Sequence, residues 1–529
     1  MHRSIRRWCL ALGLGPLLAG LALAAQPAWF DAAGHARPEA LQAVSLLRAA
    51  DTHGLDPSDY GAEHLAEALG KAGQPAQAVS GLDQALTEAM LRYLRHLRHG
   101  RVDPRQVGGG FRPSRQGGLD AQAVLQEALA AGDLAQAVHR SVPPLGQYEQ
   151  LRQALQHYRT LTGHPAWQQA LPALPVRATA GARKLEPGSR YAGLHLLARR
   201  LEALGDLPPR TVSRYEGDDA LYDDELVQAV RRFQQRHGLT VDGVPGRQTL
   251  AQLAVKPDER VVQIGLALER LRWTPLLQSR RMVVVNIPEF VLRGYELTDR
   301  GIRVGTEMRV IVGKAARHAT PLFDEEMRFI EFSPYWNVPR SIAADETVPR
   351  LLRDPGHLDR MGYEIVGRDG SIHRLVNDEL LADVLAGRAL LRQRPGPENA
   401  LGGIKFVFPN REHIFLHDTP AVSLFRRDGR AFSHGCIRVE DPLALARFVM
   451  QEMPAWTEAR IVEAMGRGES QTVRLSPPVP VVIAYITALV KDGQVHFFDD
   501  IYGHDRMLQA ALKAREPGAR GDTRPAGQR

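Results

Sequence analysis

The chain has 529 residues, more than a single hydrophobic core holds, so the length predicts several domains. Hydrophobic residues make up 44% and charged residues 24%, a globular composition that excludes a wholly disordered or collagen-like chain. The net charge of +7 comes from scattered Lys and Arg without an aromatic-interleaved basic stripe, which argues against a nucleic-acid partner and favours attraction to an anionic polymer.

The first 25 residues have the pattern of a secretory signal peptide. A basic start precedes the apolar run 8–21, and Ala22-Leu23-Ala24 supplies a small-residue cleavage pattern. An uncleaved membrane anchor is the alternative, but the run is shorter than the ~20 residues that a spanning helix needs. We therefore predict that residues 1–25 are removed and that the mature chain lies in an oxidising compartment.

Removal of the signal peptide would also remove Cys9 and leave Cys436 as the only cysteine. An unpaired thiol in an oxidising compartment can pair between chains, be buried and inert, or react. Its surroundings must decide between these alternatives.

Residues 26–188 are predicted to form a helical scaffold domain. Gly100 stands where the clearest helix would end, and the Pro-containing stretch 165–187 is typical of a linker. No catalytic pattern occurs here. Apolar residues recur along one helical face at Leu86, Met90, Tyr93, Leu94 and Leu97.

Residues 189–256 are predicted to form a compact unit of three helices. Gly205 and Gly238 mark the ends of the first two, and Asp242-Gly243 predicts a turn before the third. The inward positions are Leu194, Leu197, Leu201 and Leu204, then Leu226, Val230 and Phe233, then Thr249, Leu250 and Leu253.

Residues 260–515 change to the period of β-strands, with short β-branched runs punctuated by Gly and Pro. The section 341–394 interrupts them with helical stretches at 348–352 and 379–391, which predicts a cap or lid. Residues 516–529 are predicted to be disordered. The fold class is therefore multidomain α+β. Strands are expected at 282–287, 290–295, 308–313, 328–332, 404–408, 412–416, 481–487 and 494–498.

Cys436 lies in a setting that favours reactivity. A thiol that attacks an amide needs a base, because a free Cys is only a few per cent ionised at pH 7. His417 ends the apolar run 414–416, and the following loop is long enough to return Cys436 to its side. The backbone carbonyl of Asp418 or a neighbouring group could orient the imidazole.

Residues beside the cysteine suit the same chemistry. Gly435 lets the backbone approach a substrate, and the N–H groups of Gly435 and Cys436 are placed to hold a developing oxyanion. Arg438 would lie on the same face of an extended segment and could clamp a substrate carboxylate.

Two alternatives compete with a reactive thiol. His413, His417, His434 and Cys436 could form a zinc site, but closely spaced ligand pairs are missing and only one thiolate is available. Cys436 could also be buried and inert. We expect His434 to be a hydrogen-bonded structural histidine rather than a second base, and we predict no metal and no cofactor.

These residues resemble a known family. His417 together with the run 433–439, Ser-His-Gly-Cys-Ile-Arg-Val, is similar to the signature of the L,D-transpeptidase (YkuD) catalytic domain. The segments 272–275, 332–339, 391–397 and 416–420 resemble long periplasmic members of the YcbB type, which carry a helical cap. The run 229–250 resembles a peptidoglycan-binding module, which can bind glycan or serve as a spacer.

The resemblance implies a role for each matched residue. Cys436 would be the acylated nucleophile, His417 the base, the Asp418 main chain its orienter, and Gly435 part of the oxyanion hole. Long members often have Ser-Ser where this chain has Ser433-His434, which leaves the role of His434 open. Residues implied in or near the substrate cleft are Trp336, Asn337, Phe432, Ser433, His434 and Arg438.

The resemblance also implies a periplasmic peptidoglycan L,D-transpeptidase. Such an enzyme releases D-Ala from a tetrapeptide stem and forms a 3-3 crosslink with a second stem. The implied partners are peptidoglycan stem peptides, other cell-wall synthases and carbapenem-type β-lactams as covalent inhibitors, and no nucleic acid. Two alternatives stay open: a carboxypeptidase or endopeptidase that uses water as acceptor, and a non-catalytic wall-binding protein.

Overall fold

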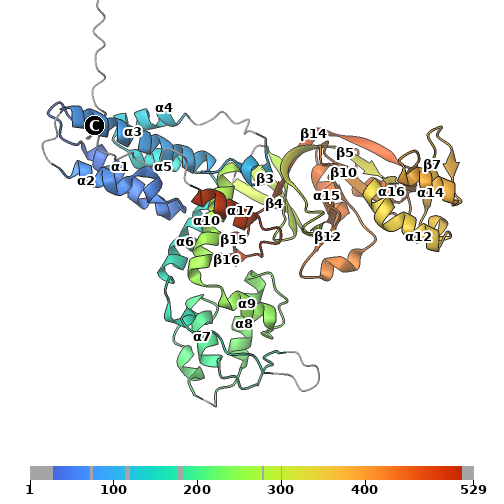
Figure 1. Ribbon diagram of the computed structural model, residues 1–529, viewed down its shortest axis with the longest axis horizontal. Coiled ribbons are helices and arrows are strands. Elements are labelled where there is room, and N and C mark those ends of the chain that lie inside the picture. Colours follow the sequence, from blue (N-terminus) through green and yellow to red (C-terminus); the bar gives the residue numbers. More distant parts are fainter. Residues whose placement is uncertain are drawn as a thin grey trace, which may run out of the picture.

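The computed structural model describes residues 28–71, 76–112, 120–175, 183–217, 219–276, 279–299 and 301–514. The predicted signal peptide and the predicted disordered tail lie outside these residues. Within them, no helix has the length and apolar character needed to cross a bilayer. Figure 1 shows a helical N-terminal part, a separate group of short helices below it, a β-rich body and a smaller lobe at the far end.

The N-terminal part is helical from α1 to α6. Its helices are α1 (Pro38–Arg48), α2 (Ala62–Leu69), α3 (Ala76–His99), α4 (Ala121–Ala131), α5 (Leu134–Ser141) and α6 (Gly146–Thr160), with 3-10 turns η1 (Ala49–His53), η2 (Pro57–Tyr60), η3 (Pro104–Val107) and η4 (Pro165–Trp167). The five apolar residues predicted to share one face of α3 are all buried. Gly100 has φ +79° directly after α3, so the predicted helix end is confirmed.

The second unit contains α7 (Leu194–Ala203), the 3-10 turn η5 (Val212–Tyr215), α8 (Asp224–Arg236) and α9 (Arg247–Ala254). Leu226, Val230 and Phe233 on α8 are fully buried in its core, as predicted. The three predicted helices are therefore present, and Gly238 ends α8 with φ +64°.

A long helix, α10 (Pro257–Trp273), occupies the region where the sequence predicted a change to strands, so that prediction is wrong at this point. Its period is obscured because several charged residues of α10 are buried and hydrogen-bonded, including Arg260, Arg270 and the pair Glu269–Arg272. A helix that buries charges on its inner faces does not show the apolar stripe from which helices are recognised.

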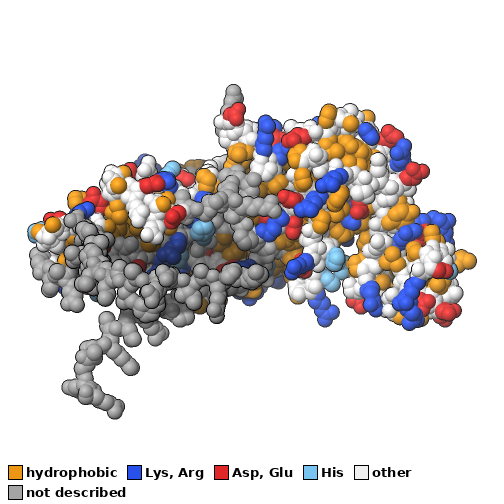
Figure 2. All heavy atoms as spheres, turned by 90° about the horizontal axis from the view of Figure 1, so that it is seen from above, with side chains coloured by type: hydrophobic (Ala, Val, Ile, Leu, Met, Phe, Trp, Pro, Cys, Tyr) orange, Lys and Arg blue, Asp and Glu red, His pale blue; other side chains and the backbone are white. Residues whose placement is uncertain are grey.

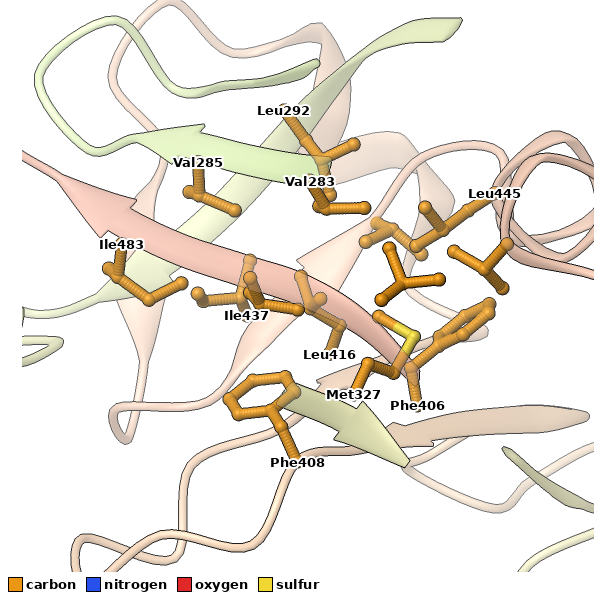
Figure 3. Close-up of a cluster of buried hydrophobic side chains, with 14 of the residues drawn as sticks. Val283, Val285, Leu292, Met327, Phe406, Phe408, Leu416, Ile437, Leu445 and Ile483 are labelled. Carbon is orange, nitrogen blue, oxygen red and sulfur yellow. The ribbon is translucent and has the colours of Figure 1, made fainter. Parts of the chain in front are cut away.

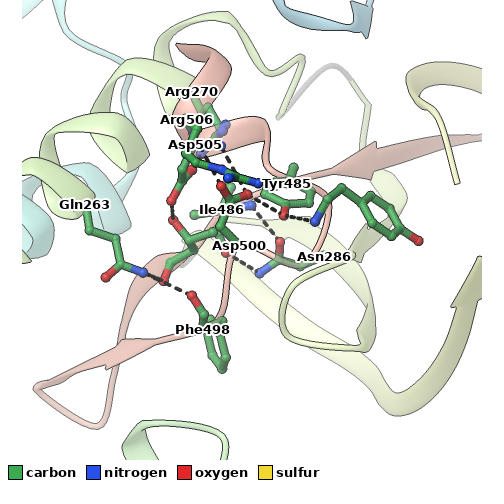
Figure 4. Close-up of polar contacts among 11 residues, drawn as sticks. Gln263, Arg270, Asn286, Tyr485, Ile486, Phe498, Asp500, Asp505 and Arg506 are labelled. Atoms are coloured by element: carbon green, nitrogen blue, oxygen red, sulfur yellow. Dashed lines mark hydrogen bonds and ion pairs between the residues drawn. The ribbon is translucent and has the colours of Figure 1, made fainter. Parts of the chain in front are cut away.

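Helix α10 joins the scaffold to the C-terminal part of the chain. It packs on α6 and on the hairpin β15 (Ala488–Lys491) and β16 (Gln494–Phe497) in one shared apolar core. Polar contacts reinforce this junction: Gln263 donates to the carbonyl of Phe498 at 3.0 Å, and Arg270 pairs with Asp505 on α17 (His504–Lys513) (Figure 4).

The β-rich body is a mixed sheet in the order β1-β5-β10-β11-β13-β4-β3-β2-β14. Because β14 pairs with both β2 and β5, the sheet closes on itself. Strand β1 (Gly109–Gly110) comes from the scaffold and pairs in parallel with β5. The other strands are β2 (Arg281–Asn286), β3 (Val291–Thr298), β4 (Gly301–Gly313), β5 (Leu322–Phe332), β10 (Ile404–Val407), β11 (Leu416–His417), β13 (Ile437–Val439) and β14 (Gln471–Ala484), and β12 (Ala431–Ser433) pairs with β4.

The inner face of this sheet is apolar. Figure 3 shows side chains of β2, β10, β11 and β13 meeting in one buried cluster, with Leu445 of α15 (Pro442–Val449) at its edge. Helix α16 (Glu458–Gly466) and the 3-10 turn η7 (Val422–Arg426) complete the body. The predicted strand 412–416 is wrong for its first four residues, because His413 has φ +54° and β11 begins only at Leu416.

The section 341–394 belongs to a lobe with its own apolar core, the cap, which begins earlier than predicted, at Trp336, because β6 (Trp336–Asn337) pairs with a strand of this lobe. It contains α11 (Arg340–Ile342), a π-helical turn η6 (Ala343–Thr347), α12 (Val348–Arg353), α13 (His357–Arg360) and α14 (Asp378–Leu385). The lobe also has a four-stranded sheet of β6 (Trp336–Asn337), β9 (Leu390–Gln393), β7 (Tyr363–Val366) and β8 (Ile372–His373). The helix predicted to reach residue 391 ends at Leu385, because Gly387 adopts φ +71° and the chain continues into β9.

Candidate active site

The predicted base and nucleophile lie on neighbouring parallel strands. In the register of β11 and β13, Leu416 is opposite Ile437 and His417 is opposite Arg438. Side chains alternate along a strand, so Leu416 and Ile437 enter the core while His417 and Arg438 share the other face. Cys436 directly precedes β13 and lies two positions from Arg438, which places it on the face that carries His417.

The His417 imidazole is buried and has one nitrogen engaged. Its Nδ1 lies 2.5 Å from the carbonyl oxygen of Asp418. A carbonyl oxygen only accepts, so Nδ1 carries the proton and Nε2 keeps a free lone pair. This is the tautomer that a general base requires.

The Asp418 carboxylate is turned away from the imidazole. Its oxygens accept from the N–H of Gly403 at 2.8 Å and from the N–H of Thr419 at 2.6 Å. Asp418 therefore contributes its main chain to His417 and uses its side chain to hold the neighbouring turn. Part of a cavity of about 490 Å³ is lined by this turn and by Asp418.

The Cys436 thiol is partly buried, and it donates to the carbonyl oxygen of His413 with Sγ and O 3.8 Å apart. The described contacts of Sγ include no hydrogen bond to His417. Burial raises the pKa of the thiol. A hydrogen bond from the Phe415 backbone and the charges of Lys405 and Arg438 lower it, but by less. The thiol is therefore protonated at neutral pH in this arrangement.

Burial and two cations lower the pKa of His417 to about 3. Arg438 lies opposite His417 on β13, and Lys405 lies opposite it on β10. Both positive charges disfavour a second proton on the ring. The shifts in both pKa values favour the uncharged thiol and the uncharged imidazole over a thiolate–imidazolium ion pair.

The turn that carries Cys436 is fixed by its own hydrogen bonds. The Ser433 hydroxyl donates to the carbonyl of Cys436 at 2.5 Å and accepts from the N–H of Gly435 at 3.2 Å. Thr320 donates to the carbonyl of Gly435 at 2.7 Å. Gly435 has φ +116°, a conformation that side-chain-bearing residues rarely adopt.

These contacts modify two sequence-based expectations. Ser433 is buried and its hydroxyl bonds to the loop backbone, so it shapes the turn, while its predicted place in the substrate cleft stays a prediction. The Gly435 N–H is engaged by Ser433, whereas no described residue accepts from the N–H of Cys436. Of the two expected oxyanion donors, the Cys436 N–H is the one left available.

Arg438 is partly buried, and its Nε has no hydrogen-bond partner among the described residues. A buried guanidinium nitrogen without an acceptor is costly unless a ligand supplies one. Arg438 can therefore receive an anionic or carbonyl group on the face that carries His417 and Cys436.

The other predicted cleft residues are divided between two parts of the molecule. Trp336 and Asn337 form β6 of the cap, and Trp336 packs partly against the cap core. Phe432 is 45% exposed beside the nucleophile loop on β12. His434 is half-exposed and contacts the cap through Glu346.

Several residues at the site escaped the sequence analysis. Lys405 could have been found, because it is a polar residue at an alternate position of a predicted apolar strand. Thr320, His318 and Glu346 gave no such signal, since only the folded chain brings them to the nucleophile loop. Among the described residues, no group of three or more His, Cys, Asp or Glu is arranged to hold a metal ion.

Three family models match successive parts of the chain. Residues 22–155 match a "Scaffold domain", residues 190–253 a "Putative peptidoglycan binding domain", and residues 280–483 the "L,D-transpeptidase catalytic domain" of YkuD type. Residues 280–483 are an L,D-transpeptidase catalytic domain. The multidomain α+β organisation is confirmed, with a helical N-terminal region, a peptidoglycan-binding domain and a β-rich L,D-transpeptidase domain. Both peptidoglycan-related domains indicate an extracytoplasmic place at the cell wall.

A curated relative supports the domain assignment. The chain is 30% identical over 272 residues to a Haemophilus influenzae protein named "Putative L,D-transpeptidase". The match covers 50% of this chain and 53% of the relative, so the chain spans about half the length of the curated relative that it matches.

Two solved structures align with this chain only loosely. One is a fused Zn-dependent amidase/peptidase/peptidoglycan-binding domain-containing protein from Clostridium acetobutylicum, 11% identical, with a TM-score of 0.17 over 57% of this chain and 100% of the other. The second is Bd1075 of Bdellovibrio bacteriovorus, 14% identical, with a TM-score of 0.16 over 44% of this chain and 54% of the other. Scores this low support no statement about fold or function.

Proposed function

We propose that the protein is a periplasmic peptidoglycan L,D-transpeptidase that forms 3-3 crosslinks by acyl transfer through Cys436. One observation carries the proposal: His417 ends β11 and Cys436 directly precedes the neighbouring strand β13, inside a domain that matches the L,D-transpeptidase model. The cleaved signal peptide and the boundaries 26–188, 189–256 and 260–515 belong to the same proposal.

In the first half-reaction, Nε2 of His417 takes the thiol proton while Sγ of Cys436 attacks the carbonyl carbon of the L-centre of diaminopimelate in a tetrapeptide stem. The Cys436 N–H donates to the oxyanion. The tetrahedral intermediate then breaks its C–N bond, and D-Ala leaves with the proton returned by His417. A thioester remains on Cys436.

In the second half-reaction, the side-chain amine of another stem attacks the thioester carbonyl. His417 accepts the amine proton, the C–S bond breaks, and the proton passes to Sγ. The product is the crosslinked dimer, and the neutral thiol–imidazole pair is restored. Arg438 is suited to hold a stem carboxylate during both steps, because its Nε lacks a described acceptor.

Incubation of the purified protein with disaccharide-tetrapeptide tests the proposal. Mass spectrometry should show D-Ala release and a crosslinked dimer, and Cys436→Ala should abolish both. Tripeptide without dimer would identify water as the acceptor and make the enzyme a hydrolase.

A carbapenem-type β-lactam should add its mass to Cys436, because it offers a strained amide to the same thiol. If neither this adduct nor any stem product forms, the catalytic proposal fails and a wall-binding role replaces it.

A further inference from the structure

His434 links the nucleophile turn to the cap. Its Nε2 lies 2.8 Å from Oε1 of Glu346, and the two side chains are 36% and 57% exposed. Glu346 belongs to the π-helical turn η6 at the start of the cap, far from His434 in the sequence. Pi-helical turns are rare and occur frequently at functional sites.

His434 also contacts the segment between β4 and β5. The rings of His318 and His434 pack edge to face with centroids 4.6 Å apart. The same segment holds the backbone of the turn, since the N–H of Lys314 donates to the carbonyl of Ser433 at 2.8 Å. Figure 2 shows histidine side chains gathered at the notch between the cap lobe and the rest of the molecule.

The contact acts close to the nucleophile. His434 lies two positions before Cys436, between Ser433 and Gly435, whose carbonyls accept from the Lys314 N–H and the Thr320 hydroxyl. The carboxylate of Glu346 accepts from Nε2–H in the neutral tautomer that carries the proton there, and forms an ion pair with protonated His434. In either form it restrains the His434 side chain, which connects the turn to the cap.

We infer that Glu346 is a positioning residue for Cys436. Through His434 it ties the nucleophile turn to the cap, so that the turn is held in reactive geometry when the cap is seated on it. This inference rests on the proposed function and assigns to His434 the role that its sequence left open.

Kinetics of D-Ala release by the full mature chain test the inference. Glu346→Ala should lower kcat at least about threefold, the scale of a partly exposed ion pair, and leave KM within about twofold. Glu346→Gln keeps a hydrogen-bond acceptor and should recover part of the loss. Asp345→Ala is the matched control, because Asp345 is an exposed acid in the same turn, and it should behave as wild type.

A double-mutant cycle separates this role from others. If the two residues act as one contact, Glu346→Ala should cost nothing further in a His434→Ala background. The inference is overturned if the losses of kcat in the two single variants multiply in the double variant. It is also overturned if Glu346→Ala raises KM without changing kcat, or if Glu346→Ala behaves as wild type.

Hydrogen exchange provides a readout that does not depend on turnover. The amides of residues 431–436 should exchange faster in Glu346→Ala and not in Asp345→Ala; equal exchange in both would contradict the inference. The proposed function fails by a different result, namely wild-type protein that releases no D-Ala and forms no β-lactam adduct at Cys436.

Discussion

His417 is kept neutral by its surroundings and oriented by a main-chain carbonyl rather than by a carboxylate. Burial and the charges of Arg438 and Lys405 lower its pKa to about 3, while the Asp418 carbonyl holds the proton on Nδ1. A carboxylate partner would stabilise the imidazolium and raise the pKa. The site therefore favours a base that is unprotonated over a wide range of pH.

The lowered pKa of His417 predicts that the rate of acylation changes little as the pH falls below 7. For an imidazole with its ordinary pKa of about 6.5, the unprotonated fraction would fall about 25-fold between pH 7 and pH 5. Because His417 takes a proton only near pH 3, the second-order rate of acylation by a carbapenem should change less than about twofold over this interval. Circular dichroism at pH 5 controls for unfolding, and a tenfold fall with an intact fold would contradict the assignment of the base.

Gly435 is predicted to tolerate no side chain. At φ +116° an alanine is strained, and its Cβ would lie 3.2 Å from Cδ1 of Ile414. Gly435→Ala should destabilise the fold by about 1–3 kcal/mol and lower the acylation rate more than tenfold. Gly429→Ala is the control, since a Cβ there meets nothing within 4 Å. Denaturant unfolding measures the loss of stability, and intact-mass kinetics measure the rate of acylation. Equal behaviour of the two variants would refute the prediction.

At this scale the sequence predicted the residues with chemical character and missed those that support them. Cys436 was found by counting thiols, and His417 by the end of an apolar run. Glu346 and Thr320 could not be found, because a carboxylate or hydroxyl gains its role only from what the fold places beside it. A local sequence pattern reveals residues with chemical character, but it does not reveal the residues that support them in the folded chain.

The segment between β4 and β5 supports the nucleophile turn. Thr320 is fully buried, and its hydroxyl accepts from the N–H of Gly313 at 2.9 Å while donating to the carbonyl of Gly435 at 2.7 Å. One side chain thus joins the end of a sheet strand to the turn before Cys436. The geometry of the turn depends on this element as much as on its own sequence.

Thr320→Val should therefore weaken both stability and acylation. The substitution keeps the shape and leaves a buried N–H and a buried carbonyl without partners, at a cost of about 1–3 kcal/mol. Thr320→Ser should restore most of the loss, and the exposed Thr472→Val should be neutral. Chemical denaturation and the rate of adduct formation at Cys436 report the result; a Thr320→Val variant as stable as wild type would argue against the bridge.

Elements were predictable where one face meets water and the other meets a core. The helices α3 and α8 follow that rule, whereas β2 is buried along its whole length and was predicted from its run of β-branched residues. Helix α10 does not follow the rule, because it is enclosed by the scaffold, the C-terminal hairpin and α17, and it buries Arg272 with Glu269. Burial of paired charges removed the pattern that would have identified it.

At the scale of the whole molecule, Phe497 lies where the separate units meet. Its ring contacts Tyr158 of α6 at a centroid distance of 5.3 Å and stacks with His237 of the peptidoglycan-binding domain at 5.7 Å. The guanidinium of Arg260 on α10 lies 4.4 Å from the same ring. The units are therefore joined through a shared core, although the sequence suggested domains connected by linkers.

Phe497→Ala should separate the units. Loss of a fully enclosed aromatic ring costs about 3–5 kcal/mol, here at the junction rather than inside one domain. Calorimetry should show a single main transition for the wild type and split transitions for the variant. Leu375→Ala, at an exposed position of the cap, is the control. If Phe497→Ala unfolds at a lower temperature but still in one undivided transition, the junction does not couple the units.

The contacts of α17 have a consequence for how the chain folds as it emerges. Arg101 of the scaffold donates to the carbonyl of Leu512 at 2.9 Å, and α17 also packs against η3 and α10. The scaffold is synthesised first, yet part of its surface is covered only by residues near the other end of the chain. Contacts this distant in the sequence form slowly, so the apolar surface of Val102 and Val107 stays uncovered until Leu508 of α17 has been made and has packed against it.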